Sequence, residues 1–126
     1  MSLRPFLALA LSLGLAACGG SISLGFGHYD DDAPNVSLVV SPTSAARGDT
    51  LRLVAAASDD YAVVVVEFYR VDPGGTTLLG SDRAPPYQFD TVVPAGAGAS
   101  LQYVARAVDD AGQRTDSAAA VVVVTP

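Results

Sequence analysis

Residues 63–72 read Val63-Val64-Val65-Val66-Glu67-Phe68-Tyr69-Arg70-Val71-Asp72 and run directly into the turn Pro73-Gly74-Gly75. β-Branched and aromatic side chains dominate this stretch, and a Pro-Gly-Gly turn closes it, which is the pattern of a β-strand. Glu67 is polar, so its neighbours Val66 and Phe68 are predicted to point to the opposite, core-facing side of the strand.

Similar short apolar runs occupy most of the chain after residue 34. They lie at residues 36–40, 50–57, 76–81, 87–93, 101–108 and 117–124. Turn residues separate them at spacings of about 8–12 residues, and no segment shows a sustained helical period. Together these runs predict an all-β fold, an immunoglobulin-like antiparallel sandwich of about seven strands that spans residues 35–126.

Four motifs in this region resemble the bacterial Ig-like domain family. They are Ser58-Asp59-Asp60, Val66-Glu67-Phe68-Tyr69, Pro86-Tyr87-Gln88-Phe89, and Tyr103-Val104-Ala105-Arg106-Ala107 leading into Asp109-Asp110-Ala111-Gly112. The resemblance covers residues 35–125 and implies an adhesive, spacing or accessory-binding module with no shared catalytic residues. Tyr103 stands at the tyrosine-corner position, so its hydroxyl is expected to bond to the backbone of the preceding corner. Ala105 replaces the cysteine of antibody-type domains, so no disulfide clamps the core.

Residues 1–17 are predicted to be a lipoprotein signal peptide with a helical apolar segment. Arg4 supplies a positive start, and an apolar run from Pro5 to Leu15 follows. Counted on through Ala17, the run has about 13 residues and spans about 20 Å as a helix, too short for a permanent transmembrane segment. Leu15-Ala16-Ala17-Cys18 resembles the bacterial lipobox, which implies cleavage before Cys18 and attachment of lipid, palmitate included, to that cysteine. The alternative is an ordinary signal peptide with a chance cysteine near the cut.

Residues 18–34 are predicted to be a lipidated, flexible linker, because Gly, Ser and Asp dominate them without a sustained period. His28 lies beside Asp30, Asp31 and Asp32, and a solvated linker residue is favoured over a metal ligand. Lipoproteins of Gram-negative cells that carry Asp after the cysteine stay at the inner membrane. Gly19 in that place favours the outer membrane if the cell is Gram-negative, and the expected location is the cell envelope.

Composition excludes several classes of function. The chain has 7 Lys plus Arg against 13 Asp plus Glu, a formal net charge of −6, and all of its basic side chains are arginines. An acidic chain with no basic cluster argues against nucleic acid as a partner. One His and one Cys rule out multi-His or multi-Cys metal sites and most pairs of nucleophile and base. We therefore expect no enzymatic activity and no cofactor, apart from the calcium discussed next.

Acidic loops are expected to gather at one pole of the sandwich. In this topology the entry to the first strand and two of the connections share that pole, which brings Asp59, Asp60, Asp109 and Asp110 near Asp30, Asp31 and Asp32. A solvated acidic pole is tolerable, because carboxylates about 6 Å apart in water repel by only ~0.7 kcal/mol. Alternatively, Asp59, Asp60, Asp109 and Asp110 are ligands of a Ca²⁺ ion. Both interpretations stay open.

A second candidate site is the outer face of the sheet that holds runs 63–71, 101–108 and 117–124. Its predicted members are Val63, Val65, Glu67, Tyr69, Val104, Arg106 and Val108, with alternate valines of the last run. Pairing the two charges, Glu67 opposite Arg106, places Val65 opposite Val108 and Tyr69 opposite Val104. A contiguous apolar patch of this kind marks a partner site, whereas scattered exposed valines reflect only strand propensity.

These observations favour a lipid-anchored envelope lipoprotein whose single Ig-like domain is a non-catalytic protein- or glycan-binding module. The alternative is a structural accessory lipoprotein that stabilises an envelope complex and binds calcium at its acidic pole. Because the last apolar run ends shortly before Pro126, the domain itself is expected to be the functional part.

Overall fold

The computed structural model describes residues 32–126, so the predicted signal peptide, Cys18, His28, Asp30 and Asp31 lie outside the described residues. The described chain forms nine strands: β1 (Asn35–Ser41), β2 (Ser44–Ala46), β3 (Thr50–Ser58), β4 (Val63–Asp72), β5 (Gly75–Asp82), β6 (Tyr87–Val92), β7 (Ser100–Asp109), β8 (Arg114–Asp116) and β9 (Ala120–Thr125). Among these residues there is no helix of a length and apolarity that would cross a membrane.

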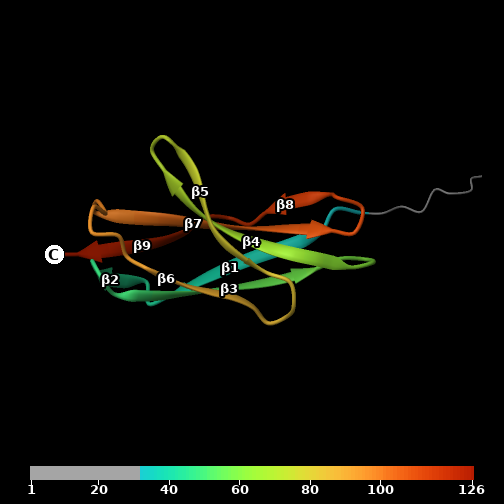
Figure 1. Ribbon diagram of the computed structural model, residues 1–126, viewed down its shortest axis with the longest axis horizontal. Helices are drawn as coiled ribbons and strands as arrows, with labels where there is room; N and C mark the ends of the chain where they lie inside the picture. The colour runs from blue at the N-terminus through green and yellow to red at the C-terminus, as the bar shows by residue number, and fades with distance from the viewer. Residues whose placement is uncertain (1–31) are drawn as a thin grey trace, which may run out of the picture. The chain divides into compact units, whose positions relative to one another are not determined.

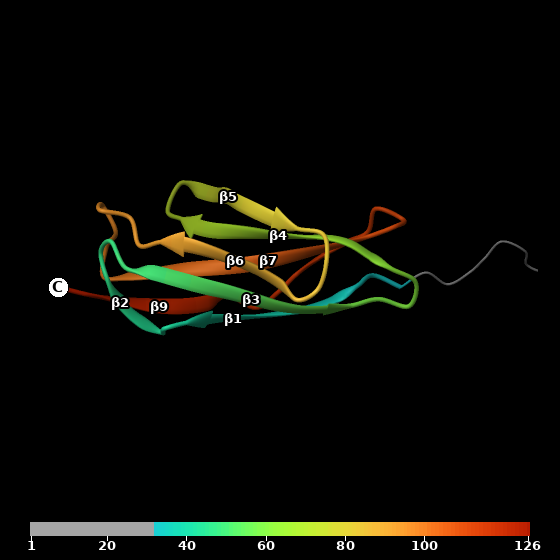
Figure 2. The same ribbon diagram turned by 60° about the horizontal axis from the view of Figure 1, so that its bottom comes forward.

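The strands build two sheets that pack face to face. One sheet has the order β1-β3-β6, and the other has the order β2-β9-β7-β4-β5, with β8 paired to β7. In Figure 1, β7, β8 and β9 lie above β3 and β6, and Figure 2 shows the β4–β5 hairpin at the edge of the sandwich opposite to β1. The prediction of an immunoglobulin-like sandwich is confirmed, and so is the sharing of one sheet by β4, β7 and β9.

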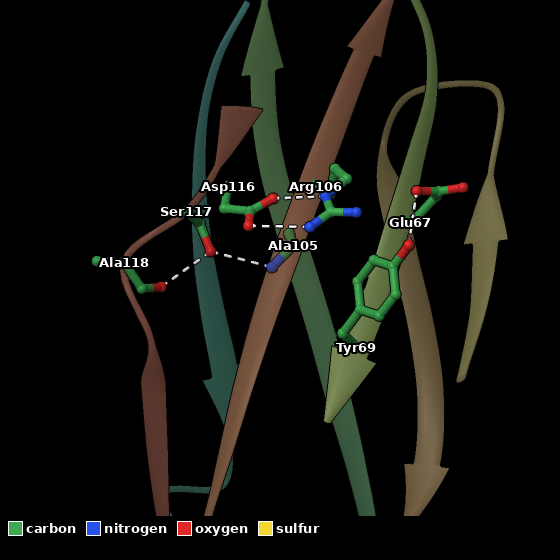
Figure 3. A network of polar contacts seen from close by, with 7 residues as sticks. All are labelled: Glu67, Tyr69, Ala105, Arg106, Asp116, Ser117 and Ala118. Atoms are coloured by element: carbon green, nitrogen blue, oxygen red, sulfur yellow. Dashed lines mark hydrogen bonds and ion pairs between the residues drawn. The ribbon is translucent and has the colours of Figure 1, made fainter. Parts of the chain in front are cut away.

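The predicted strand at 117–124 is wrong in its first part, because the chain leaves the ladder between β8 and β9. Ser117 causes the break. Its backbone N–H donates to Ala105 O at 2.8 Å, while its Oγ accepts from Ala105 N at 3.0 Å and donates to Ala118 O at 2.8 Å. The hydroxyl therefore takes the place of a ladder partner, as the dashed lines of Figure 3 show. A side chain that bonds to nearby backbone in this way competes with regular pairing.

The core follows the alternation read from the sequence. Val66 and Phe68 of β4 are fully buried, and so are Leu51 and Leu53 of β3 in the facing sheet. Phe68 stacks on Phe89 with ring centroids 6.1 Å apart. On β7 the inward positions 105 and 107 are both fully buried alanines. Small side chains there leave room for the phenylalanine pair between the sheets, since interiors are packed without voids.

The predicted tyrosine corner is wrong. Tyr103 is buried as expected, but its hydroxyl oxygen has no hydrogen-bond partner among the described residues. The corner before β7 is secured by another side chain, because Ala97 O accepts from Arg47 Nε at 3.0 Å and also from Arg47 Nη2. Tyr103 lies opposite Arg70 in the β4–β7 register. Burial raises the pKa of its hydroxyl above the usual value of 10.0.

Gly80 on β5 tests the tightness of this packing. An added Cβ would lie 2.3 Å from Phe89 Cε1, and Phe89 is held by its stack on Phe68. We expect Gly80→Ala to lower the free energy of unfolding by about 1–3 kcal/mol, the usual cost of overpacking, as measured by denaturant unfolding. Gly96→Ala is the matched control, because nothing lies within 4 Å of its Cβ position. Equal free energies of unfolding for the two variants would contradict the conclusion that Phe89 leaves no room for a side chain at position 80.

Candidate functional site

The pairing of β4 with β7 determines which side chains share the outer face of the larger sheet. Val65 lies opposite Val108, Glu67 opposite Arg106, and Tyr69 opposite Val104. These are the three pairs predicted by matching the two charges, so the predicted register is confirmed. All six side chains are partly exposed, and the residues between them, Val66 and Phe68 on β4 and Ala105 and Ala107 on β7, are buried in the core.

Val63 does not belong to this face, which corrects one predicted member. The register between β4 and β7 shifts between Val63 and Val65. The irregularity turns the first residue of β4, and Val63 packs against the hydrophobic core. Its neighbour Val64 is exposed instead. A shift of one position exchanges the two faces of a strand, and simple alternation does not reveal such an irregularity.

The neighbouring strands extend the apolar surface on both sides. Leu78 of β5 lies opposite Tyr69, and Val121 of β9 lies opposite Gln102 of β7. Leu78 is 55% exposed, Val121 51% and Val123 54%, which are high values for large apolar side chains within strands. Only the valines were predicted. The short run 76–81 does not assign a face to Leu78 from the sequence, and only its pairing to β4 places it beside Tyr69.

The polar centre of this face is assembled differently from the predicted Glu67–Arg106 pair. Tyr69 Oη donates to Glu67 Oε1 at 2.9 Å. Arg106 Nε and Nη2 donate to the two oxygens of Asp116 at 2.7 and 3.2 Å. The guanidinium carbon of Arg106 also lies 5.0 Å from the centroid of the Tyr69 ring, a cation–π contact. Figure 3 shows these groups side by side on β4, β7 and β8.

Arg106 forms its ion pair with Asp116, and not with Glu67, because of the strand geometry. β8 pairs with β7 so that Asp116 stands directly opposite Arg106, and its carboxylate meets the guanidinium edge to edge, the strongest arrangement for this pair. The ion pair raises the pKa of Arg106 and lowers the pKa of Asp116, mainly through the hydrogen bonds between them. Burial and the bond to Glu67 raise the pKa of Tyr69, against the opposing charges of Arg106 and Arg114.

Chemically, this face is suited to contacts with another surface. The Val65–Val108 pair lies on one side of the Glu67–Arg106 row and the Tyr69–Val104 pair on the other, and Glu67 and Asp116 hold the tyrosine and the arginine in place. Tyrosine and arginine held rigidly among apolar side chains are the residue types that anchor protein interfaces. No part of residues 32–126 contains His, Lys or Cys, so the described domain lacks the usual bases for a hydroxyl nucleophile.

The second predicted site, the acidic pole, is assembled in part. The turns after β3 and β7 meet, because Asp110 N donates to Ala62 O at 3.2 Å. Asp60 Oδ2 accepts from Asp32 N at 3.2 Å. Asp109 is buried, whereas Asp60 and Asp110 are exposed. Within residues 32–126, no three His, Cys, Asp or Glu side chains gather into a group that would hold a metal ion.

Comparison with solved structures finds the same fold in several bacterial proteins. Fibronectin(III)-like modules of Clostridium thermocellum CbhA align with a TM-score of 0.57 and 29% identity, over 71% of this chain and 94% of that one. This similarity supports the expected Ig-like domain. No family description matches the chain, and no curated protein matches it either.

Two further structures share the fold alone. Pectate lyase PelI from Erwinia chrysanthemi, solved with tetragalacturonic acid, aligns with a TM-score of 0.52 and 19% identity, over 68% of this chain but 27% of its own length. Spo0M, a sporulation control protein from Bacillus subtilis, aligns with a TM-score of 0.52 and 10% identity over 75% of this chain. Proteins as different as these show that the fold does not specify one activity.

The ion pairs predict how stability depends on pH. Arg106 lowers the pKa of Asp116, and Arg70 with Thr77 lowers the pKa of Asp72, both from an ordinary value of 3.8. A carboxylate whose pKa is lower in the folded state stabilises the fold above its unfolded pKa and loses that effect as pH falls. We expect denaturant unfolding between pH 4 and pH 2 to show a shallower loss of stability in the variant Asp72→Asn/Asp116→Asn than in the wild type.

The control for this experiment is Asp110→Asn, which removes an exposed carboxylate from outside the ion pairs described above. It should retain the steep acid loss of the wild type. Parallel pH profiles for all three proteins would show that the two ion pairs make no pH-dependent contribution.

Proposed function

We propose that this protein is a lipid-anchored lipoprotein of the cell envelope whose Ig-like domain binds a protein or glycan without catalysis. The observation that carries the proposal is the outer face of the larger sheet, where Val65, Tyr69, Val104 and Val108 lie beside the exposed Leu78. When one face of an antiparallel sheet is exposed to solvent, its strands normally alternate between apolar residues on the core side and polar residues on the solvent side. Here the solvent side of a central strand pair remains apolar on either side of one polar row.

The polar row supports recognition of a specific partner. Arg106 and Tyr69 are positioned by Asp116 and Glu67 before any partner arrives, which lowers the entropic cost of binding. Glu67 and Asp116 carry two negative charges and Arg106 carries one positive charge, so the polar row offers no excess positive charge. A partner surface with apolar side chains around a few hydrogen-bonding groups matches this arrangement. A surface of phosphates does not.

Attachment to the membrane rests on the sequence. Leu15-Ala16-Ala17-Cys18 supplies the lipobox, and the lipid chains of a modified cysteine exceed the two-chain requirement for stable anchoring. The segment 18–34 then links Cys18 to the start of β1 at Asn35. As a flexible coil, it would place the domain roughly 20 Å from the membrane surface. With Gly19 after the cysteine, the outer membrane is the proposed location in a Gram-negative cell.

Lysine substitutions on the outer face test the binding surface. Val65→Lys, Val104→Lys and Val108→Lys should each reduce photo-cross-linking to envelope components by about tenfold or more, because an unpaired ammonium is costly to bury. Val39→Lys is the matched control, since Val39 is a highly exposed valine of the other sheet. Circular dichroism verifies that the variants fold. Unchanged cross-linking in all three face variants, with folding intact, would exclude this face as the binding site.

Replacing Cys18 tests the anchor separately. We expect Cys18→Ser to leave the protein soluble after export, or unprocessed, because no thiol remains to accept the lipid. Detergent phase partitioning and mass analysis of the mature N-terminus measure this directly. Ser21→Cys in the Cys18→Ser background places a thiol outside the lipobox and should not restore anchoring. Recovery of the serine variant in the detergent phase at the wild-type level would rule out the lipid anchor.

A further inference from the structure

Two aspartates at the same end of the sandwich each keep one buried oxygen without a partner. Asp59 directly follows β3, and Asp109 is the last residue of β7. Asp109 is only 1% exposed. Asp59 Oδ1 and Asp109 Oδ2 are both buried, and neither has a hydrogen bond to any described residue. A buried polar atom without a partner is costly, more so when it belongs to a charged group.

Strand alternation directs both side chains between the two sheets. On β3 the inward positions are 51, 53, 55 and 57, and Asp59 is next in phase. On β7 the inward positions are 101, 103, 105 and 107, and Asp109 is next in phase. The turns that carry them lie at the same end of the molecule in Figure 1, around the β3–β4 and β7–β8 connections. Both carboxylates therefore lie at the same end of the sandwich, in the inward phase of their strands.

Hydrogen bonds bring the two turns together and hold each carboxylate in place. Asp59 Oδ2 accepts from Tyr61 N and Ala62 N, both at 3.1 Å. Asp109 Oδ1 accepts from Ala111 N at 3.0 Å and Gln113 N at 2.7 Å. Ala62 O in turn accepts from Asp110 N, and Val63, the next residue, stands opposite Asp109. In each aspartate, one carboxylate oxygen accepts the hydrogen bonds that hold its turn, and the other oxygen has no hydrogen-bond partner among the described residues.

Within residues 32–126, no arginine forms an ion pair with Asp59 or Asp109. The ion pairs there join arginines to Asp72, Asp90 and Asp116, all on other parts of the sheets. Asp60 and Asp110 add negative charge at the same pole but are exposed, and Asp60 is bonded to Asp32 N. Only Asp59 and Asp109 therefore combine a buried carboxylate oxygen with the lack of an ion pair. They are two of the four aspartates that the sequence suggests as calcium ligands.

We propose that Asp59 Oδ1 and Asp109 Oδ2 bind one Ca²⁺ ion between the β3–β4 and β7–β8 turns. Calcium prefers carboxylate oxygens and tolerates irregular geometry completed by backbone carbonyls and water, whereas Mg²⁺ demands a nearly ideal octahedron. Two carboxylates without a third acidic ligand make a weak site, with a dissociation constant of about 1 mM as in extracellular modules. Such an ion joins the β3–β4 connection between the two sheets to the β7–β8 turn of the larger sheet, and therefore stabilises the fold, whatever partner the outer face binds.

The test is thermal unfolding of the full-length protein in detergent, followed by circular dichroism. Raising Ca²⁺ from zero, in EDTA, to 10 mM should raise the Tm by roughly 5–10 °C, because the ion binds only the folded state. The same concentration of Mg²⁺ should give a clearly smaller shift. An identical Tm in EDTA and in 10 mM Ca²⁺ would overturn the proposal, as would equal shifts with the two ions, which would indicate only screening of the acidic pole.

Asparagine variants identify the ligands. Asp59→Asn and Asp109→Asn each keep an oxygen that accepts the turn amides but lose the charge, so each should abolish the Ca²⁺-dependent shift. Their Tm in EDTA should equal or exceed that of the wild type, a result that loss of a purely structural carboxylate would not produce. Asp110→Asn, at the exposed neighbouring position, should retain the full shift. If Asp109→Asn does not fold, Asp59→Asn decides alone, and a full Ca²⁺ shift in that variant refutes the assignment.

Discussion

The antiparallel pairing of β4 with β7 is the constraint on which the rest of this structure depends. These two ten-residue strands lie at the centre of the larger sheet, and their register puts Phe68 opposite Ala105 and Tyr69 opposite Val104. Since side chains alternate with a period of two, one register assigns every residue of both strands either to the core or to the outer face. The large residue opposite the small one leaves the space in which Phe68 stacks on Phe89.

Both strands are longer than the hydrophobic core that they line, and this explains the polar groups at the two ends of the inter-sheet space. Beyond Phe68, the next positions of β4 in the same phase are Arg70 and Asp72, which pair with each other at 2.8 Å. Beyond Ala107, the next inward position of β7 is Asp109. One end therefore holds a neutralised pair, and the other holds carboxylates that no arginine of the described chain neutralises. The calcium proposal follows from that asymmetry.

The outer face and the short strand β8 form one unit. β8 has only three residues, but it brings Asp116 to Arg106 and so holds the guanidinium over the Tyr69 ring. Ser117 then lifts the chain away from the ladder before β9 begins. A partner that contacts the face meets side chains whose positions are already determined, while the neighbouring valines and Leu78 supply apolar area. Structural similarity to fibronectin(III)-like modules is consistent with such a role.

The sequence by itself determined the sandwich class, the inward and outward faces of the long strands, and the β4–β7 register, because alternation and charge matching act within or between continuous strands. The sequence pattern places Val65, Tyr69, Val104 and Val108 on the outer face of the larger sheet, where the structure has them. Only the tertiary structure decided that Val63 turns inward at a register shift and that Arg106 pairs with Asp116 instead of Glu67. The same holds for the Tyr103 hydroxyl, which has no hydrogen-bond partner among the described residues. Each of these depends on which distant groups arrive at one point in space, and that is a property of packing between strands rather than of any pattern along the chain.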